Sequence, residues 1–222
     1  MTEFILTTVL LTGKIAGVAT AIALLTGVAA AWAMHRCEFI GRSLVDALLM
    51  LPMVLPPTVL GYYLLTALGR KSPLGRWLEQ TLDIRLIFTW QGAVIAAAIV
   101  AFPLVYQGAR AALQGVDPQL ENAARTLGAG EFRVFGRVTL PLAWPGVLAG
   151  AMLAFARAMG EFGATLMVAG SLPGKTQTLA LAIYDSVQAG RDAEALLLVG
   201  ITSLVCVLIL VVAARVLRTR HP

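Results

Sequence analysis

The sequence predicts an all-α membrane protein, in which residues 1–222 form one domain built as a single bundle of about five transmembrane helices. Its composition is 59% hydrophobic and 13% charged, with a mean hydropathy of +0.83. In soluble globular domains about a quarter of the residues are charged. Five stretches also hold the roughly 20 apolar residues that crossing the hydrocarbon core requires. Because lipid offers no partner to backbone N–H and C=O groups, these stretches should be helices.

The predicted spans cover residues 9–34, 44–68, 88–107, 147–170 and 196–217. The first span is too long for a secretory signal peptide and has no small-residue cleavage site before its charged flank. The remaining residues are too few for a nucleotide-hydrolysing domain of ordinary size beside the bundle. We therefore do not expect the chain to be an enzyme by itself.

The distribution of basic residues predicts the orientation of the bundle. An odd number of spans places the termini on opposite sides, and with the C-terminus inside, the inner segments carry more arginine and lysine than the outer ones. We therefore expect an external N-terminus, a cytoplasmic C-terminus and a cytoplasmic segment 117–141. The net charge of +5 indicates this topology and contact with lipid headgroups, not nucleic acid. On the outer side, Trp77 lies among charged residues, which is typical of an amphipathic helix on the membrane surface.

The segment between the third and fourth spans is unusually polar and reads NAARTLGAGEFRVFGRVTLP over residues 122–141. We expect a short helix over residues 120–127, a glycine break at Gly128 and Gly130, and a second amphipathic helix over residues 131–138. The small Ala123 and Ala124 suit a helix that approaches another protein closely, and the glycines permit a reversal of the backbone. Taken alone, the segment could equally be a solvated loop between helices.

The second span contains Pro52, Pro56 and Pro57, which interrupt the helical hydrogen bonds within the membrane. Such breaks are tolerated where they face protein or a water-filled cavity, and they often mark a transport path. We predict that Pro56, Pro57 and Thr58 shape a pathway or its gate, with Tyr62 following. A kink that only fits the neighbouring helices is the alternative.

The fourth span carries Arg157 and Glu161 within apolar sequence. At positions i and i+4 they should lie on one helical face and form an ion pair, which lowers the cost of placing either charge in the membrane. Arg157 could attract an anion in a pathway, or the pair could simply hold the helix against its neighbours. The sequence favours neither interpretation.

No pattern for catalysis, metal binding or cofactor binding is evident. The segment GSLPGKT at residues 170–176 resembles a phosphate-binding loop, but it has three residues between its glycines, follows a span and falls on the outer side. His35 and His221 have no carboxylate or nucleophile pattern around them. Cys37 and Cys206 give neither a disulfide framework nor metal-ligand spacing. We expect no catalytic residue, metal or cofactor in this chain.

The polar segment resembles the cytoplasmic coupling loop of ABC importer permeases. In that family Glu-Ala-Ala, three residues, Gly, nine residues, Ile, one residue and Leu-Pro follow in order. The spacing matches at Ala123, Ala124, Gly128, Leu140 and Pro141. Asn122 stands where the family usually has Glu, with Glu121 just before it, and Val138 replaces Ile. The pieces VLPPTVLGYYLL and LAFARAMGEFGAT are similar to the molybdate and sulfate branch of these permeases.

The resemblance implies a type I ABC importer permease in a bacterial inner membrane. In that family, two permease copies each dock one cytoplasmic ATPase subunit, which binds ATP and Mg, and a periplasmic binding protein delivers the substrate, here molybdate. The implied coupling residues are Glu121, Asn122, Ala123, Ala124, Arg125, Gly128, Gly130, Leu140 and Pro141. The predicted pathway or gate residues are Pro56, Pro57, Thr58, Tyr62, Arg157, Glu161, Gly163 and Thr165.

Other functions remain open. Sulfate, thiosulfate or tungstate could replace molybdate as the substrate. An ATP-independent channel or secondary transporter would need a proton or sodium site in the spans and would need no docking loop. An intramembrane enzyme would need a catalytic dyad or a metal cluster at membrane depth, and the sequence suggests neither.

Overall fold

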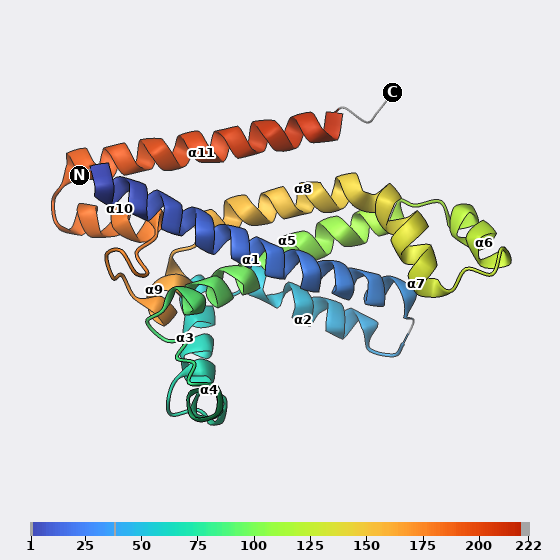
Figure 1. The fold of residues 1–222 in the computed structure, drawn as a ribbon, viewed down its shortest axis with the longest axis horizontal. Coiled ribbons are helices and arrows are strands. Elements are labelled where there is room, and N and C mark those ends of the chain that lie inside the picture. The colour runs from blue at the N-terminus through green and yellow to red at the C-terminus, as the bar shows by residue number, and fades with distance from the viewer. Residues whose placement is uncertain (1, 38, 219–222) are drawn as a thin grey trace.

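The computed structural model describes residues 2–37 and 39–218, which form helices and contain no strand. Four long helices are arranged along one another: α1 (Thr2–Arg36), α5 (Trp90–Gln114), α8 (Leu140–Met159) and α11 (Asp192–Arg218) (Figure 1). Helix α1 packs against α5 and α8, and α5 packs against α8. The close approach of α5 and α8 relies on small residues, since a Cβ added at Gly108 would lie 2.9 Å from the Gly150 Cα.

The predicted number of about five spans is confirmed. Among the described residues, four helices are long and apolar enough to cross a membrane, and a fifth span results if the bent pair α2 (Arg42–Val54) and α3 (Pro57–Leu68) is counted as one broken span. The four are Glu3–Arg36, Trp90–Gln114, Glu131–Met159 and Asp192–Val212. The chain therefore forms an all-helical bundle of the predicted class.

The second span is broken at its prolines, as the sequence predicts. The axes of α2 and α3 differ by 107°, because a residue before proline disfavours the helical conformation. Leu55 precedes Pro56 and has ψ 140°, and Pro56 precedes Pro57 and has ψ 135°. Pro57 then starts α3, where its missing N–H is not needed. The predicted span 44–68 is thus two helices instead of one.

The fourth span lies earlier in the chain than residues 147–170. Helix α7 (Glu131–Val134), the π-helical turn η1 (Phe135–Thr139) and α8 follow one another without a break and give a continuous helix from Glu131 to Met159. The chain then turns and starts the short helix α9 (Gly163–Ala169). Glu161 stabilises this start by accepting a hydrogen bond from the Ala164 amide at 2.8 Å. Apolar composition extends across the break, so it could not reveal where the helix ends.

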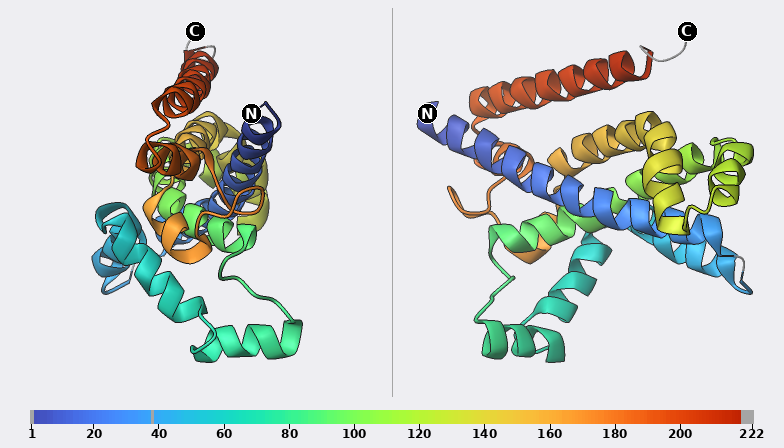
Figure 2. Two further views of the ribbon diagram at one scale, coloured as in Figure 1. Left: turned by 90° about the vertical axis from the view of Figure 1, so that its left-hand side faces the viewer. Right: turned by 45° about the vertical axis from the view of Figure 1, so that its right-hand side comes forward.

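Helix α10 (Leu179–Gln188) lies at the end of the bundle where α1 begins, whereas α3 and α4 (Pro73–Leu82) project sideways, away from the long helices (Figure 2). Helix α4 carries the exposed Trp77, as predicted for a surface helix. The GSLPGKT segment forms a turn in which the Thr176 hydroxyl accepts from the Leu172 amide at 3.1 Å. At the opposite end of the bundle, the loop between α5 and α7 contains α6 (Pro118–Thr126).

Candidate coupling loop and translocation pathway

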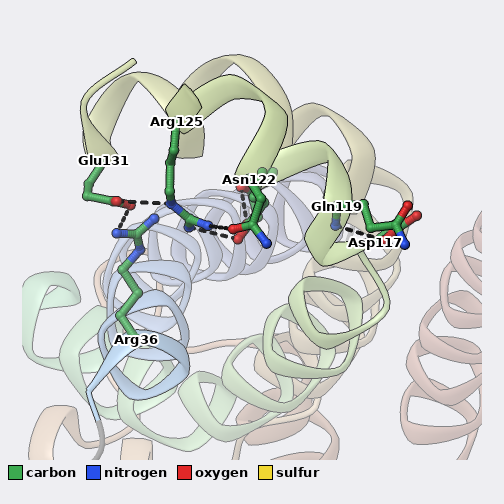
Figure 3. A network of polar contacts seen from close by, with 8 residues as sticks. Arg36, Asp117, Gln119, Asn122, Arg125 and Glu131 are labelled. Carbon is green, nitrogen blue, oxygen red and sulfur yellow. Dashed lines mark hydrogen bonds and ion pairs between the residues drawn. The ribbon is translucent and has the colours of Figure 1, made fainter. Parts of the chain in front are cut away.

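Helix α6 begins at Pro118, two residues before the expected start. The Asp117 carboxylate caps the helix by accepting a hydrogen bond from the Gln119 amide at 2.9 Å (Figure 3). Pro118 occupies the first helical position, where proline is favoured. The start of α6 is therefore fixed by Asp117 and Pro118, and neither Glu121 nor Asn122 is needed to cap it.

Arg125 is the centre of a polar network that holds α6 in place. Its guanidinium donates to the Asn122 side-chain oxygen at 2.7 Å, to Glu121 at 3.0 Å and to Glu131 at 3.0 Å (Figure 3). Asn122 thus contributes a neutral acceptor, and Glu121 supplies the carboxylate one residue earlier. The network joins α6 to the first residue of α7.

Glu121 also connects α6 to the helix that crosses the membrane. Its second carboxylate oxygen accepts a hydrogen bond from the Thr139 hydroxyl at 2.5 Å, and Thr139 is buried in η1. Burial alone would raise the pKa of Glu121, but the hydrogen bonds from Thr139 and Arg125 together lower this pKa below the ordinary value of 4.5. Glu121 is therefore a charged anchor at neutral pH.

Helix α6 ends in a Schellman motif that requires glycine at position 128. The Ala129 amide donates to the Ala124 carbonyl at 3.1 Å, and the Gly128 amide donates to the Arg125 carbonyl at 2.9 Å. Gly128 has φ +80°, which L side chains rarely adopt. Gly130, by contrast, is extended with φ −70° and ψ 159°. The prediction that both glycines permit the reversal is thus wrong for Gly130.

The loop presents apolar side chains to solvent although its backbone is well ordered by polar contacts. Leu127 is 88% exposed, Phe132 80% and Leu120 48%. Ala123 is exposed beside them, whereas Leu140 packs against the core near the base of α8. Leu120 and Leu127 lie outside the four apolar helices, and Phe132 lies in the first turn of the Glu131–Met159 helix. Exposed apolar side chains of this kind are typical of surfaces that bind another protein.

The structure brings together two of the predicted pathway segments. Helix α3 packs against α9, and a Cβ added at Gly163 would lie 2.9 Å from the Pro57 Cβ and 3.5 Å from the Thr58 amide nitrogen. Thr165 is buried in the same helix, whereas Tyr62 is exposed on α3. Only glycine at position 163 allows this contact between the two helices.

Arg157 and Glu161 form the predicted ion pair, with 2.9 Å between the Arg157 Nη1 and the Glu161 Oε2. The pair does not lie on one continuous helical face, because α8 ends at Met159 and Glu161 follows the break. The Glu161 side chain is 1% exposed and that of Arg157 is 37% exposed. Arg157 also lines a cavity of about 150 Å³ with Pro52, Met53, Leu55, Pro57, Val100 and Leu104. Arg157 therefore lies beside the break between α2 and α3.

A polar cluster that the sequence analysis missed joins α2 to α5. Asp46 accepts a hydrogen bond from the Tyr106 hydroxyl at 2.5 Å and forms an ion pair with Arg110. The sequence does indicate that Asp46 has a partner, because an acidic residue inside a predicted span is usually paired. Its partners lie far away in the sequence and could not be assigned.

A larger cavity, of about 870 Å³, lies between α3, α4 and the segment before α5. Its lining residues all lie between Leu65 and Phe88, and none of them is a predicted pathway residue. We therefore do not assign it to the pathway. No group of three or more His, Cys, Asp or Glu residues that could hold a metal ion occurs within residues 2–37 and 39–218.

Comparison with solved structures identifies the fold. A chain of the MetNI methionine ABC transporter in an inward-facing conformation superimposes with a TM-score of 0.74, covering 100% of this chain and 98% of that chain at 16% sequence identity. At this identity the likeness shows the fold alone. The fold is that of a type I ABC importer permease.

Comparison with sequences identifies the family. The family model described as "Binding-protein-dependent transport system inner membrane component" matches residues 17–221, and the chain belongs to this family. The molybdenum transport system permease protein ModB of Escherichia coli K12 is 48% identical over 180 residues, which are 81% of this chain and 79% of the relative. The sulfate transport system permease protein CysT of the same organism is 38% identical over 162 residues, 73% of this chain and 58% of the relative.

Proposed function

We propose that the chain is the membrane permease subunit of an ATP-driven molybdate importer. The observation that carries this proposal is the high identity with a molybdenum permease over most of both chains. Identity with the sulfate permease is lower and covers less of that relative, so sulfate is the weaker candidate. Tungstate resembles molybdate so closely in size and charge that a site for one should accept the other.

The complete importer would contain two copies of this chain, two cytoplasmic ATPase subunits and an external substrate-binding protein. ATP and Mg would bind to the ATPase subunits. The proposed orientation has the N-terminus outside, because α6 and the start of α2 lie at the end of the bundle opposite the start of α1 (Figure 1). Arg36, Arg110 and Arg125 lie toward this same end, as expected for a cytoplasmic face.

The exposed face of α6 would bind the ATPase subunit. The loop offers apolar side chains at Leu120, Leu127 and Phe132, and the small Ala123 allows close approach. Arg125 and its partners fix the helix, so a displacement of α6 is not absorbed by a flexible loop. ATP binding would then favour one arrangement of the two α6 helices over another, which is the requirement for a driven conformational change.

A continuous helix would carry this displacement to the pathway. The Glu121–Thr139 hydrogen bond attaches α6 near the start of the Glu131–Met159 helix. Arg157 lies in the last turn of that helix, beside the break between α2 and α3. Movement at the inner loop should therefore change the surroundings of Arg157 and the contact between α3 and α9.

Arg157 would attract the oxyanion without binding it tightly. The guanidinium is partly exposed toward the cavity, and Glu161 neutralises part of its field. A permease must release its substrate, so a weak site suits transport better than a strong one. A purely structural role for the pair predicts that a double variant without both charges recovers transport, whereas a role toward the anion predicts that it does not.

The proposal is tested by reconstituting the permease with its ATPase subunits and binding protein in proteoliposomes. We expect ATP-dependent molybdate uptake that tungstate inhibits and that an excess of sulfate leaves largely unchanged. Sulfate uptake that molybdate does not inhibit would assign the sulfate function instead. Uptake without ATP would contradict the importer class and would indicate a channel or secondary transporter.

A further inference from the structure

The C-terminal part of α1 contacts the coupling loop at two points that the proposed function does not use. The Trp32 ring lies 5.1 Å from the Phe132 ring and 4.9 Å from the Phe135 ring, measured between centroids. The Arg36 guanidinium forms an ion pair with Glu131 and lies 5.5 Å from the Trp32 ring centroid. An aromatic contact and a charged contact therefore join two segments that are far apart in the sequence.

Glu131 extends this contact to α6. One of its carboxylate oxygens pairs with Arg36, and the other accepts from the Arg125 Nε at 3.0 Å (Figure 3). Glu131 is the first residue of α7, where the helix dipole already favours a negative charge. Arg36 is thus not required to start the helix. What Arg36 adds is a link from α1, through Glu131 and Arg125, to α6.

This link gives α6 a second attachment to the bundle. Helix α1 packs along α5 and α8, so its position is fixed by the core. The first attachment is the Glu121–Thr139 hydrogen bond at the base of α8. A short helix held at one point can rotate about that point, whereas attachments to two different helices restrict its angle. With both in place, movement of α6 must displace α1 together with α8.

We propose that Arg36 and Trp32 are positioning residues that set the angle of α6, so that movement of a docked partner is transmitted to α1 and α8 together. This inference rests on the proposed docking function of α6. Partly exposed ion pairs contribute little to stability. Loss of Arg36 should therefore change the efficiency of coupling and leave folding and assembly almost intact.

The test uses the intact complex in proteoliposomes and measures molybdate transported per ATP hydrolysed. We expect Arg36→Ala to lower this ratio about two- to fivefold, with the ATPase subunit still bound. Arg36→Lys, which keeps the charge opposite Glu131, should recover most of the ratio. The matched control is Arg42→Ala, because Arg42 lies at the same end of the bundle but acts on Asp46 of α2 and makes no ion pair with the loop within the described residues. This control should transport as much molybdate per ATP hydrolysed as the wild type.

A structural measurement accompanies the transport assay. Spin labels on the exposed Cys37 and on Leu127→Cys, with Cys206→Ala in the background, report the distance between α1 and α6. The distance distribution should be narrow in the parent and broader with Arg36→Ala or Trp32→Ala. An unchanged distribution together with an unchanged transport ratio would overturn the inference.

The same assay separates failure of this inference from failure of the docking function. Gly128→Val alters the loop itself and should abolish coupling if α6 docks the ATPase. If Gly128→Val abolishes coupling and Arg36→Ala behaves like Arg42→Ala, the docking function stands and the positioning role of Arg36 is refuted. If Gly128→Val has no effect, the docking function is refuted, and the inference falls with it.

Discussion

The two ends of the helix from Glu131 to Met159 are held in different ways. At the inner end, charged and hydroxyl groups bind α6 through hydrogen bonds, in a loop that solvent reaches. Beyond the outer end, α9 packs against α3 at Gly163, with no space for an additional carbon atom. Polar contacts can exchange with water and re-form when a loop moves, whereas a glycine contact fits only one arrangement. Variants at the packed end should therefore lose stability, whereas variants at the inner end should mainly lose order in the loop.

The largest loss of stability is expected at the packed end, from Gly163→Val. The new Cβ would lie 2.9 Å from the Pro57 Cβ, so the contact between α9 and α3 must open. Overpacking of this kind costs about 3 kcal/mol of stability, and transport should fall at least tenfold. Thermal unfolding of the purified permease and uptake in proteoliposomes measure the two effects. Gly200→Val is the matched control, because a Cβ there meets nothing within 4 Å; equal losses in both variants would contradict the packing argument.

The next largest effect is expected from Arg157→Ala. Removal of the guanidinium leaves the buried Glu161 carboxylate without its ion pair, which should cost about 2 kcal/mol. The double variant Arg157→Ala, Glu161→Gln should regain stability because no unpaired charge remains. If Arg157 serves the anion, as we propose, transport by the double variant stays low. Recovery of both stability and transport would show that the pair is only structural.

At the inner end, Gly128→Ala should have a smaller effect. An alanine at φ +80° costs about 1 kcal/mol from backbone strain alone, since a Cβ at this position meets nothing within 4 Å. Loop protection in hydrogen exchange should fall, and so should the rate of coupled ATP hydrolysis. Gly130→Ala provides the contrast in hydrogen exchange, because its extended backbone suits any residue. Equal loss of protection in both variants would show that the left-handed turn is not what orders the loop.

The smallest effect is a dependence of loop order on pH. The pKa of Glu121 is lowered in the folded loop. Its stabilising contribution is therefore complete above pH 4.5, the ordinary pKa, and is lost as the pH falls through the lower pKa of the folded state. The free energy that protects α6 from hydrogen exchange, obtained relative to the intrinsic exchange rate at each pH, should fall in that acidic range by less than about 1 kcal/mol. Glu121→Gln should remove this part of the pH dependence. A profile that is identical in Glu121→Gln and the wild type would assign the effect to other carboxylates.

The class of fold and the turn at Gly128 in the loop could be predicted from the sequence. Apolar stretches reveal spans because lipid demands about 20 such residues, and Gly128 in its spacing predicted a turn that the structure contains. The break at Pro56 and Pro57 was predicted from the prolines, but the end of the long helix at Met159 was not. Apolar residues continue past Met159, and where the helix stops depends on local backbone preferences and on the Glu161–Ala164 hydrogen bond.

Contacts between distant segments could not be predicted. The partners of Asp46 lie on α5. Arg36 pairs with Glu131, although two spans and α6 separate them in the sequence. Each of these charged residues stands in a sequence that gives no sign of its partner. The exposed apolar surface of the loop could not be predicted either, because the exposure of Leu127 and Phe132 depends on how α6 and α7 are placed relative to α1.

The central claim is that the loop around α6 faces the cytoplasm, where an ATPase subunit covers it. The most direct measurement is labelling of Leu127→Cys by a membrane-impermeant thiol reagent, in a background with Cys37→Ala and Cys206→Ala. We expect labelling in inside-out vesicles stripped of the ATPase, protection when the ATPase is added back, and no labelling from outside intact cells. Labelling from outside, or labelling that the ATPase does not reduce, would contradict the account.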